Sequence, residues 1–162
     1  PRRARSGLFQ LSNDWTLLVD VPSGRVQVPA AIAITIQRPD ILLYSTTLRR
    51  VIFGELTSPW EDRVSEAHSL KQAKYEGLLE QAALNRWSPE LFTIEVGSRG
   101  YVAPSLRAFL CALDLPLAQC RSTIARCSAV ALRCSYIIYL SRDVPEWTQG
   151  GNTMDTPSGV VA

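Results

Sequence analysis

The middle of the chain carries the pattern that most restricts the fold: three short apolar runs arranged around one long helical segment. The first two runs, residues 41–44 and 51–56, have the length of strands, and the polar residues 46–50 between them are typical of a hairpin connection. Apolar residues at helical spacing then follow over 60–85. The third run, 91–96, predicts another strand. Strands, a helix and a strand in this order predict a sheet covered by a helix.

Further elements are expected on both sides of this central unit. Patterns of strand length precede it at residues 15–21, 25–28 and 30–36, before Pro39 interrupts the pattern. Two helices are expected after it, at residues 104–113 and 116–140. The complete order predicts an α/β fold with a central mixed β-sheet flanked by helices.

The size and composition of the chain suit one globular domain. It has 162 residues, of which 46% are apolar and 20% are charged, close to the average of soluble proteins. We expect the domain to cover residues 1–147 and the Gly-, Thr-, Ser- and Pro-rich segment 148–162 to be a flexible tail. Because the first residue is Pro1 rather than Met, we expect a fragment of a longer polypeptide. No apolar run approaches the roughly 18–20 residues of a membrane span, so no membrane is expected.

Several classes of function find no support in the sequence. The formal net charge of +2 is too small to indicate a nucleic-acid partner by itself. The glycine-rich and serine motifs of nucleotide-binding proteins and serine hydrolases are absent. Cys120, Cys127 and Cys134 recur every seven residues along the last expected helix, which spreads their thiols over roughly 20 Å, too far to surround one ion. We expect them to be small buried residues in a reducing compartment, with no zinc site.

Two carboxylates stand where neighbouring strands of the expected hairpin begin and end. Asp40 precedes the strand at 41–44, and Glu55 lies near the end of the strand at 51–56. If these strands pair, the carboxylates come close together and repel each other unless a divalent cation neutralises them. Such oxygen ligands suit Mg²⁺ or Mn²⁺. The alternative is that Asp40 caps a turn and Glu55 is exposed at a strand end.

The lysines add a second signal near these carboxylates. Of the 17 basic residues, only Lys71 and Lys74 are lysines, and both lie in the helix expected after Glu55. The inward stripe of that helix contains Val64, Ala67, Tyr75, Leu78 and Ala82. Lys71 falls in this stripe, and a lysine on a buried face is costly without a carboxylate or a ligand. The alternative is that Lys71 reaches outward or pairs with a glutamate of its own helix, Glu66 or Glu76.

This ordered set of motifs resembles the PD-(D/E)XK nuclease superfamily. Pro39-Asp40 stands in the place of PD, and Glu55-Leu56-Thr57 stands in the place of (D/E)XK. The longer block RPDILL, GELTSPWEDR, EAHSLKQAKYEGLLE and FTIEVGSRGY, about residues 38–101, is similar to the restriction-like endonuclease domains that accompany reverse transcriptases in some non-LTR retroelements. The resemblance implies a restriction-endonuclease-like core and a metal-dependent DNA endonuclease that nicks target DNA. It further implies a larger reverse transcriptase polyprotein inside the cell, in the nucleus.

The chain departs from the family pattern at Thr57. The family has a lysine there, and a threonine hydroxyl cannot supply its positive charge. Some members are thought to deliver the lysine from the following helix, an arrangement that Lys71 or Lys74 matches here, with Lys71 favoured by its phase. In this interpretation Asp40 and Glu55 hold Mg²⁺ or Mn²⁺. If neither lysine reaches the site, the alternative is an inactive nuclease-fold module that binds nucleic acid or a protein partner.

Other polar residues are candidates for supporting roles. Arg38, Lys74 and Arg99 are the expected contacts to DNA, and Arg99 lies between two glycines in a loop, a suitable place for a phosphate contact. Glu95 either points into the same site or pairs with an arginine. His68, the only histidine, is expected to be exposed or satisfied by a hydrogen bond. Glu61 and Glu66 either join the acidic cluster or, as is usual near a helix start, lie on the surface. The last helix carries Arg121, Arg126 and Arg133, which either follow a DNA backbone or belong to a solvated helix face.

Overall fold

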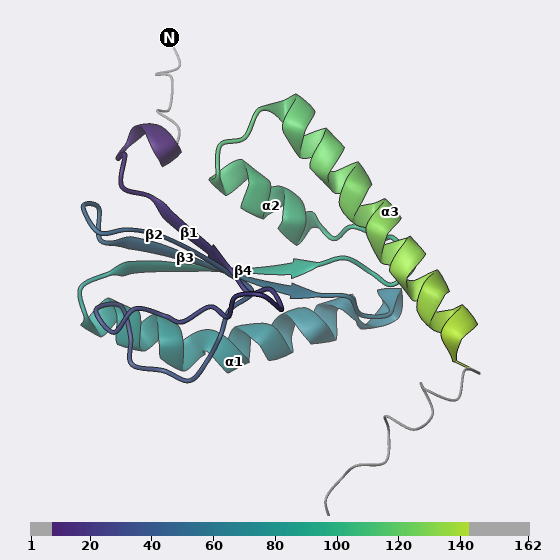
Figure 1. Ribbon diagram of the computed structural model, residues 1–162, viewed down its shortest axis with the longest axis horizontal. Helices are drawn as coiled ribbons and strands as arrows, with labels where there is room; N and C mark the ends of the chain where they lie inside the picture. The colour runs from purple at the N-terminus through teal and green to yellow at the C-terminus, as the bar shows by residue number, and fades with distance from the viewer. Residues whose placement is uncertain (1–7, 143–162) are drawn as a thin grey trace, which may run out of the picture.

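The structure, a computed structural model, describes residues 8–142 as an α/β fold with a four-stranded sheet between helices (Figure 1). The strands are β1 Thr16–Val19, β2 Ile41–Ser45, β3 Arg50–Thr57 and β4 Ser88–Glu95. The helices are α1 Val64–Leu84, α2 Pro104–Ala112 and α3 Leu117–Ser141, with short 3-10 turns at Leu8–Gln10 and Glu61–Arg63. The expected α/β class, a central mixed sheet flanked by helices, is confirmed.

The strands lie in the sheet in the order of the chain, β1-β2-β3-β4. β2 pairs antiparallel with β1 and with β3, and the turn at residues 46–49 forms the expected hairpin connection, with Arg49 in the left-handed region at a φ of 50°. β3 and β4 pair parallel. A parallel pair needs a crossover, because the chain must return to the end at which the first strand began. Helix α1 is that crossover.

The face of the sheet toward α1 holds one of two hydrophobic clusters. Successive side chains of a strand point to opposite faces, so Leu42 of β2 and Val51 and Phe53 of β3 face α1 together. They pack against Tyr75 and Leu78 of α1, and each of these five residues is at most 2% exposed. The inward stripe expected for this helix is therefore confirmed at Tyr75 and Leu78. The position of this stripe determines the direction in which the neighbouring lysines of α1 point.

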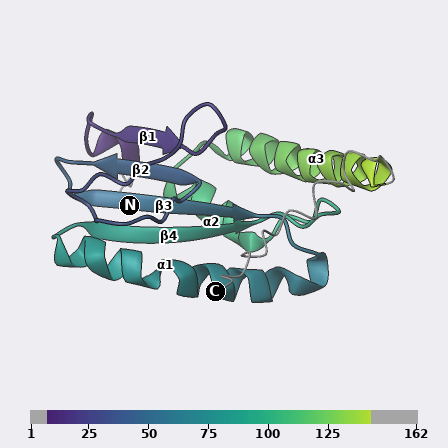
Figure 2. The ribbon, with the colours of Figure 1, turned by 60° about the horizontal axis from the view of Figure 1, so that its bottom comes forward.

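The opposite face of the sheet is covered by α2 and α3 (Figures 1 and 2). The side chains that alternate with the first set form this second cluster. Its buried members are Leu8, Leu43, Ile52, Ile94, Val96, Leu106, Phe109, Leu110 and Cys120. Burial of both faces explains why the central strand β3 is apolar almost without interruption in sequence.

Helix α3 is only partly packed, because it extends past the end of the strands (Figure 2). Cys120 is buried and Cys127 is half-buried, but Cys134 is exposed. The expectation that all three cysteines are buried is therefore wrong for Cys134. The apolar residues that follow it are exposed as well: Tyr136, Ile137, Ile138, Tyr139 and Leu140.

By length and composition, α3 is also the one helix within residues 8–142 that is apolar enough to cross a membrane, with a mean hydropathy of 1.2. The expectation that no segment qualifies is wrong by this measure. A single helix of this kind is weak evidence of a membrane, because core helices of soluble proteins pass the same test. We therefore assign no membrane segment.

The strands expected at 25–28 and 30–36 are wrong. Between β1 and β2 the described chain has only an isolated bridge, which joins Val21 to Gly24. Prolines in this stretch cannot donate to a strand ladder. Side chains hold it instead: the indole N–H of Trp87 donates a 2.7 Å hydrogen bond to one of its carbonyls. The buried apolar residues of the stretch, which join the cluster beneath α1, are Val26, Ile32 and Ala33.

The bounds of the remaining elements differ from expectation by a few residues. The helix expected from residue 60 begins at Val64, because Glu61–Arg63 form a 3-10 turn first. β4 begins before the expected residue 91, because the Ser88 N–H donates to the carbonyl of Arg49 at 2.7 Å. The expected end of the domain at 147 and the expected tail 148–162 lie outside the described residues.

Truncation of Phe53 tests the cluster beneath α1. Phe53→Ala removes a ring that is 0% exposed, and the surrounding side chains cannot fill the space fully. We expect a loss of about 3–5 kcal/mol in the free energy of unfolding, measured by urea denaturation. Ile36→Ala is the control, since Ile36 is 98% exposed and its truncation leaves no cavity. A loss below about 1 kcal/mol for Phe53→Ala would contradict this packing.

Candidate active site

Asp40, the residue just before β2, lies opposite Glu55 of β3. Ile41 faces Gly54 in the β2–β3 register, so one further step sets Asp40 beside Glu55. Both positions belong to the alternating set that faces α1. The Asp40 Oδ2 atom accepts a 2.7 Å hydrogen bond from the backbone N–H of Leu56, which fixes the carboxylate at this end of the sheet. Glu55 is 3% exposed, so the alternative of an exposed glutamate at a strand end is wrong.

Both lysines of the chain reach the carboxylate of Glu55. Lys71 Nζ lies 2.6 Å from Glu55 Oε1, and Lys74 Nζ lies 3.2 Å from the same oxygen. The Lys71 side chain is 28% exposed and that of Lys74 is 47% exposed, so Lys71 is the more deeply placed of the two. The alternative pairing of Lys71 with Glu66 or Glu76 is wrong. The helix phase that singled out Lys71 therefore indicated its true direction.

Tyr75 is a site residue that the sequence pattern identified only as core. Its hydroxyl lies 2.6 Å from Glu55 Oε2 and 3.0 Å from the carbonyl of Arg38. The hydroxyl also accepts a hydrogen bond from Lys74 Nζ at 3.2 Å. Helix α1 thus holds both the Glu55 carboxylate and the backbone just before Asp40. A signal was available, because a buried tyrosine hydroxyl usually needs a polar partner.

The two carboxylates have opposite electrostatic environments. Burial by itself raises the pKa of Glu55, but hydrogen bonds from Lys71, Tyr75 and Lys74 outweigh it and hold the pKa below its ordinary value. Burial also raises the pKa of Asp40. The hydrogen bond from the Leu56 amide lowers this pKa and the negative charge of Glu55 raises it, so that it stays above its ordinary value. Burial and the bond to Glu55 raise the pKa of Tyr75, so its hydroxyl keeps its proton. Asp40 therefore carries the less compensated negative charge.

A second polar cluster lies beside the first, on β4. Thr57 is the register neighbour of Glu95, which is buried. Glu95 Oε1 lies 3.1 Å from His68 Nδ1, and its Oε2 accepts a hydrogen bond from Ser105. Within the described residues no arginine pairs with Glu95, so the expected alternative of an arginine partner is wrong. His68 is hydrogen-bonded, which confirms one of the two alternatives expected for it.

The arginines expected to contact DNA have different surroundings. Arg99 is paired with Glu61: its Nε lies 2.8 Å from Oε2, and its backbone N–H donates to Oε1 at 2.7 Å. This ion pair holds the loop after β4 against the segment before α1. Arg38 is exposed, and its carbonyl accepts from Tyr75 as described above. The arginines of α3 are exposed as expected: Arg121, Arg126 and Arg133.

A groove of about 1160 Å³ opens between this end of the sheet and α3. Asp40 and Thr57 line it on the side of the sheet, and Arg99 lies on its border. On the other side it is lined by α3 residues that include Ile138 and Tyr139. One border of this groove is therefore formed at the end of the sheet that carries Asp40.

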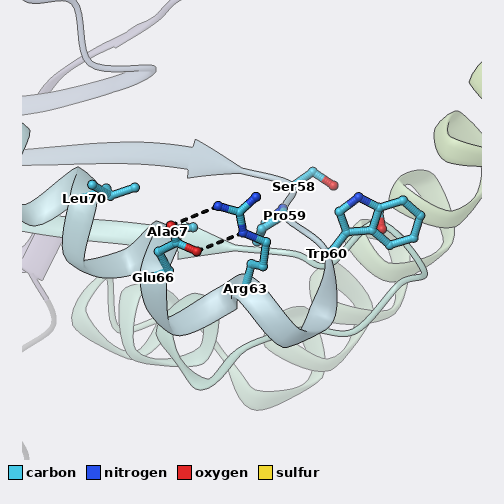
Figure 3. A pocket seen from close by; sticks show the side chains of 8 residues that line it. Ser58, Pro59, Trp60, Arg63, Glu66, Ala67 and Leu70 are labelled. Atoms are coloured by element: carbon cyan, nitrogen blue, oxygen red, sulfur yellow. Dashed lines mark hydrogen bonds and ion pairs between the residues drawn. The ribbon is translucent and has the colours of Figure 1, made fainter.

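A smaller hollow of about 200 Å³ lies beside the start of α1 (Figure 3). It is lined by residues that include Trp60 and Leu70, and the ion pair between Arg63 and Glu66 crosses it, with Nε and Oε2 2.8 Å apart. Because Glu66 is bound to Arg63, it does not join the acidic pair, in agreement with its expected surface position. Neither Asp40 nor Glu55 lines this hollow.

The donor set fits Mg²⁺ or Mn²⁺ better than a metal that requires an all-protein cage. Within residues 8–142 no group of three or more His, Cys, Asp or Glu side chains could hold an ion. Mg²⁺ commonly binds one or two carboxylates and completes its shell with water and substrate phosphates. Asp40 offers one oxygen beyond the Leu56 contact, and its raised pKa marks a negative charge that a cation would compensate. Asp40, with Glu55 beside it, is where such an ion would bind.

No protein-family model matches this chain, and no curated protein matches it in sequence.

The charge of Asp40 gives a prediction about stability. A folded-state pKa above the unfolded value means that ionisation at pH 7 costs stability, whereas the protonated form at low pH does not. Asp40→Asn removes the charge and keeps an acceptor for the Leu56 N–H. We expect its melting temperature at pH 7, without divalent metal, to exceed that of the wild type by about 2 °C. The difference should shrink as the pH falls through the folded-state pKa of Asp40, which lies above its ordinary value, because the wild-type carboxyl then becomes protonated.

The control for this comparison is Glu76→Gln, which removes one negative charge from an exposed position of α1. Its melting temperature should follow that of the wild type at both pH values. A lower melting temperature for Asp40→Asn at pH 7 would contradict the assignment of an uncompensated charge.

Proposed function

We propose that this domain is a metal-dependent endonuclease that hydrolyses phosphodiester bonds of DNA and nicks one strand of its target. The observation that carries the proposal is the arrangement at Glu55: a buried carboxylate beside Asp40, with Lys71 Nζ at 2.6 Å and Lys74 Nζ at 3.2 Å. Paired carboxylates and a lysine are what the resemblance to PD-(D/E)XK nucleases requires. Here the lysines come from α1, whereas the strand position has Thr57.

The charges of the site suit a phosphodiester. Asp40 and Glu55 would hold Mg²⁺ or Mn²⁺, which would supply an activated water and neutralise charge on a phosphate. Lys71 holds one oxygen of Glu55 in place and keeps a positive charge near the pair of carboxylates. Tyr75 fixes the other oxygen, so that Glu55 has one orientation. Preorganised charges of this kind stabilise a transition state without first having to reorient.

The groove beside Asp40 provides space for a bound substrate. Its border on the sheet includes Asp40, and Arg99 lies near it on the exposed loop after β4. Arg38, two residues before Asp40, and Lys74 of α1 are exposed as well. We assign phosphate contacts of the DNA backbone to these three side chains. Such contacts position a duplex without reading its sequence.

The proposed context is a larger retroelement polypeptide with a reverse transcriptase, active in the nucleus. In that context a nick leaves a 3′ hydroxyl from which reverse transcription is primed. The support for this context is the block of motifs over residues 38–101. The geometry of the site does not bear on this proposed context.

A second function, binding without cleavage, is favoured by a specific observation. Both oxygens of Glu55 already accept hydrogen bonds from side chains of α1, so Glu55 has little capacity left for an ion. The uncharged Thr57 agrees with loss of activity. The exposed apolar end of α3, with Ile137 and Ile138, suits a protein partner of such a module.

A nicking assay on supercoiled plasmid with Mg²⁺ or Mn²⁺ tests the proposal. We expect the full 162-residue chain to nick the plasmid. Asp40→Ala and Glu55→Gln should each lower the rate by at least about 10²-fold, because each removes charge that the site requires. The double variant Lys71→Ala/Lys74→Ala should lose a similar factor. Gln72→Ala is the matched control. Gln72 is exposed on the same helix, so this variant should nick at the wild-type rate.

The outcome that contradicts the proposal is also defined. Nicking at the wild-type rate by the folded double variant Asp40→Ala/Glu55→Gln would assign the activity to other residues or to a contaminant. A folded wild type without metal-dependent nicking would favour the binding module.

Salt and metal dependence separate the two functions by binding alone. For the nuclease, we expect the affinity for duplex DNA to fall steeply as salt rises, since phosphate contacts release counterions. We also expect Mg²⁺ at 100 times its Kd to stabilise the wild type by about 2.7 kcal/mol, measured by thermal unfolding. Asp40→Ala should remove that stabilisation. DNA binding with no stabilisation by Mg²⁺ in the wild type would favour the second function.

A further inference from the structure

His68 and Glu95 form a second ionisable pair on the α1 side of the sheet, which the function proposed above does not use. His68 Nδ1 lies 3.1 Å from Glu95 Oε1 and 2.6 Å from Thr93 Oγ1. The Glu95 side chain is 1% exposed, and its second oxygen accepts a hydrogen bond from Ser105. A buried carboxylate requires such partners. Glu95 therefore holds one edge of the imidazole ring in a fixed place.

This pair stands one strand away from Glu55. Thr93 is the register neighbour of Glu55 in the parallel pair of β3 and β4, and adjacent strands lie about 4.8 Å apart. His68 precedes Lys71 by three residues on α1, so both project from the same side of the helix. Lys71 reaches Glu55 on β3, and His68 reaches Thr93 and Glu95 on β4. The strand that the imidazole contacts is thus the direct neighbour of the strand that carries Glu55, and Asp40 lies one strand further.

The other edge of the imidazole is open. The His68 side chain is 41% exposed, and within residues 8–142 no hydrogen bond joins its Nε2 to another residue. The carboxylate of Glu95 beside Nδ1 favours the tautomer that carries its proton on Nδ1, and a neutral ring in this tautomer has its lone pair on Nε2. The ammonium groups of Lys71 and Lys74 have no lone pair to offer. His68 is the group beside the acidic pair that combines a proton-accepting atom with access to solvent.

We propose that His68 accepts the proton of the attacking water in phosphodiester hydrolysis, an inference that rests on the nuclease function proposed above. An O–H bond of water breaks as its oxygen forms a bond to phosphorus, and the proton binds Nε2. The bond between phosphorus and the 3′ oxygen breaks, and that oxygen takes a proton from solvent. The imidazolium then returns its proton to solvent. The products are a 5′ phosphate and a 3′ hydroxyl.

In this assignment Glu95 is a positioning residue. It touches the imidazole and not the substrate, and it sets the tautomer that leaves Nε2 free. Ser105, at the start of α2, orients Glu95 in turn. This chain of contacts runs from α2 across the edge strand β4 to α1. Its arrangement matches the pairing of a carboxylate with a histidine that acts as a base in other hydrolases.

The experiment compares His68→Ala and Glu95→Gln with the wild type in single-turnover plasmid nicking with Mg²⁺. We expect His68→Ala to lower the rate by about 10²-fold, with unchanged DNA affinity. Imidazole added to the reaction should restore part of the rate of His68→Ala, but not the rate of Asp40→Ala. Glu95→Gln should lose less than His68→Ala. Gln72→Ala again serves as the control on the same helix.

The outcomes separate this inference from the proposed function. Nicking at the wild-type rate by His68→Ala, while Asp40→Ala is inactive, would overturn the role of His68 and leave the nuclease assignment intact. A reduced rate that imidazole does not restore would also overturn it, since it would indicate a packing role. Absence of nicking in the folded wild type would overturn both.

A second measurement does not depend on cleavage. The nitrogen chemical shifts of the single histidine in ¹⁵N-labelled protein report its tautomer. We expect the neutral ring to carry its proton on Nδ1 in the wild type, and this preference to weaken in Glu95→Gln. A neutral ring protonated on Nε2 in the wild type has no lone pair at the open edge, and this result would overturn the proposal.

Discussion

The ion pair between Lys71 and Glu55 is the interaction on which the arrangement of this domain depends. A carboxylate with 3% exposure is tolerated only with charged or hydrogen-bonding partners, and every partner of Glu55 comes from α1. The rotation of α1 about its axis and its position along the sheet are therefore fixed by polar contacts as well as by packing. Removing one member of a buried pair typically costs about 3–5 kcal/mol, comparable to removing a large core side chain.

The same helix makes the two neighbouring carboxylates unequal. Its donors reach Glu55 and not Asp40, so one acid is stabilised as an anion while the other bears the cost of burial. Unequal environments for paired acids are typical of sites in which the two acids have different roles. In this domain Glu55 is the structural acid that joins sheet and helix. Asp40, at the border of the groove, is the acid that remains available to a ligand.

Local sequence patterns correctly predicted features that depend on a single helix or strand. They failed for contacts between segments that are distant in the sequence. The phase of Lys71 in its helical stripe follows from 3.6 residues per turn, so its inward direction could be predicted. The contact between His68 and Glu95 joins residues 27 positions apart and depends on the parallel register of β3 and β4, which no local pattern contains. The stretch before β2 has strand-like composition, yet prolines and side-chain hydrogen bonds give it an irregular path. The exposure of Cys134 depends on the sheet being shorter than α3, which the heptad spacing of cysteines cannot reveal.

The crossover connection has one further consequence. Strands β2, β3 and β4 contribute only acids and hydroxyl groups to the two polar clusters, whereas α1 contributes the cations and the imidazole. The negative charges of the site are thus on the sheet, and the positive charges that compensate them are on α1. A local opening of α1 would therefore leave the acids of the sheet without their cationic partners.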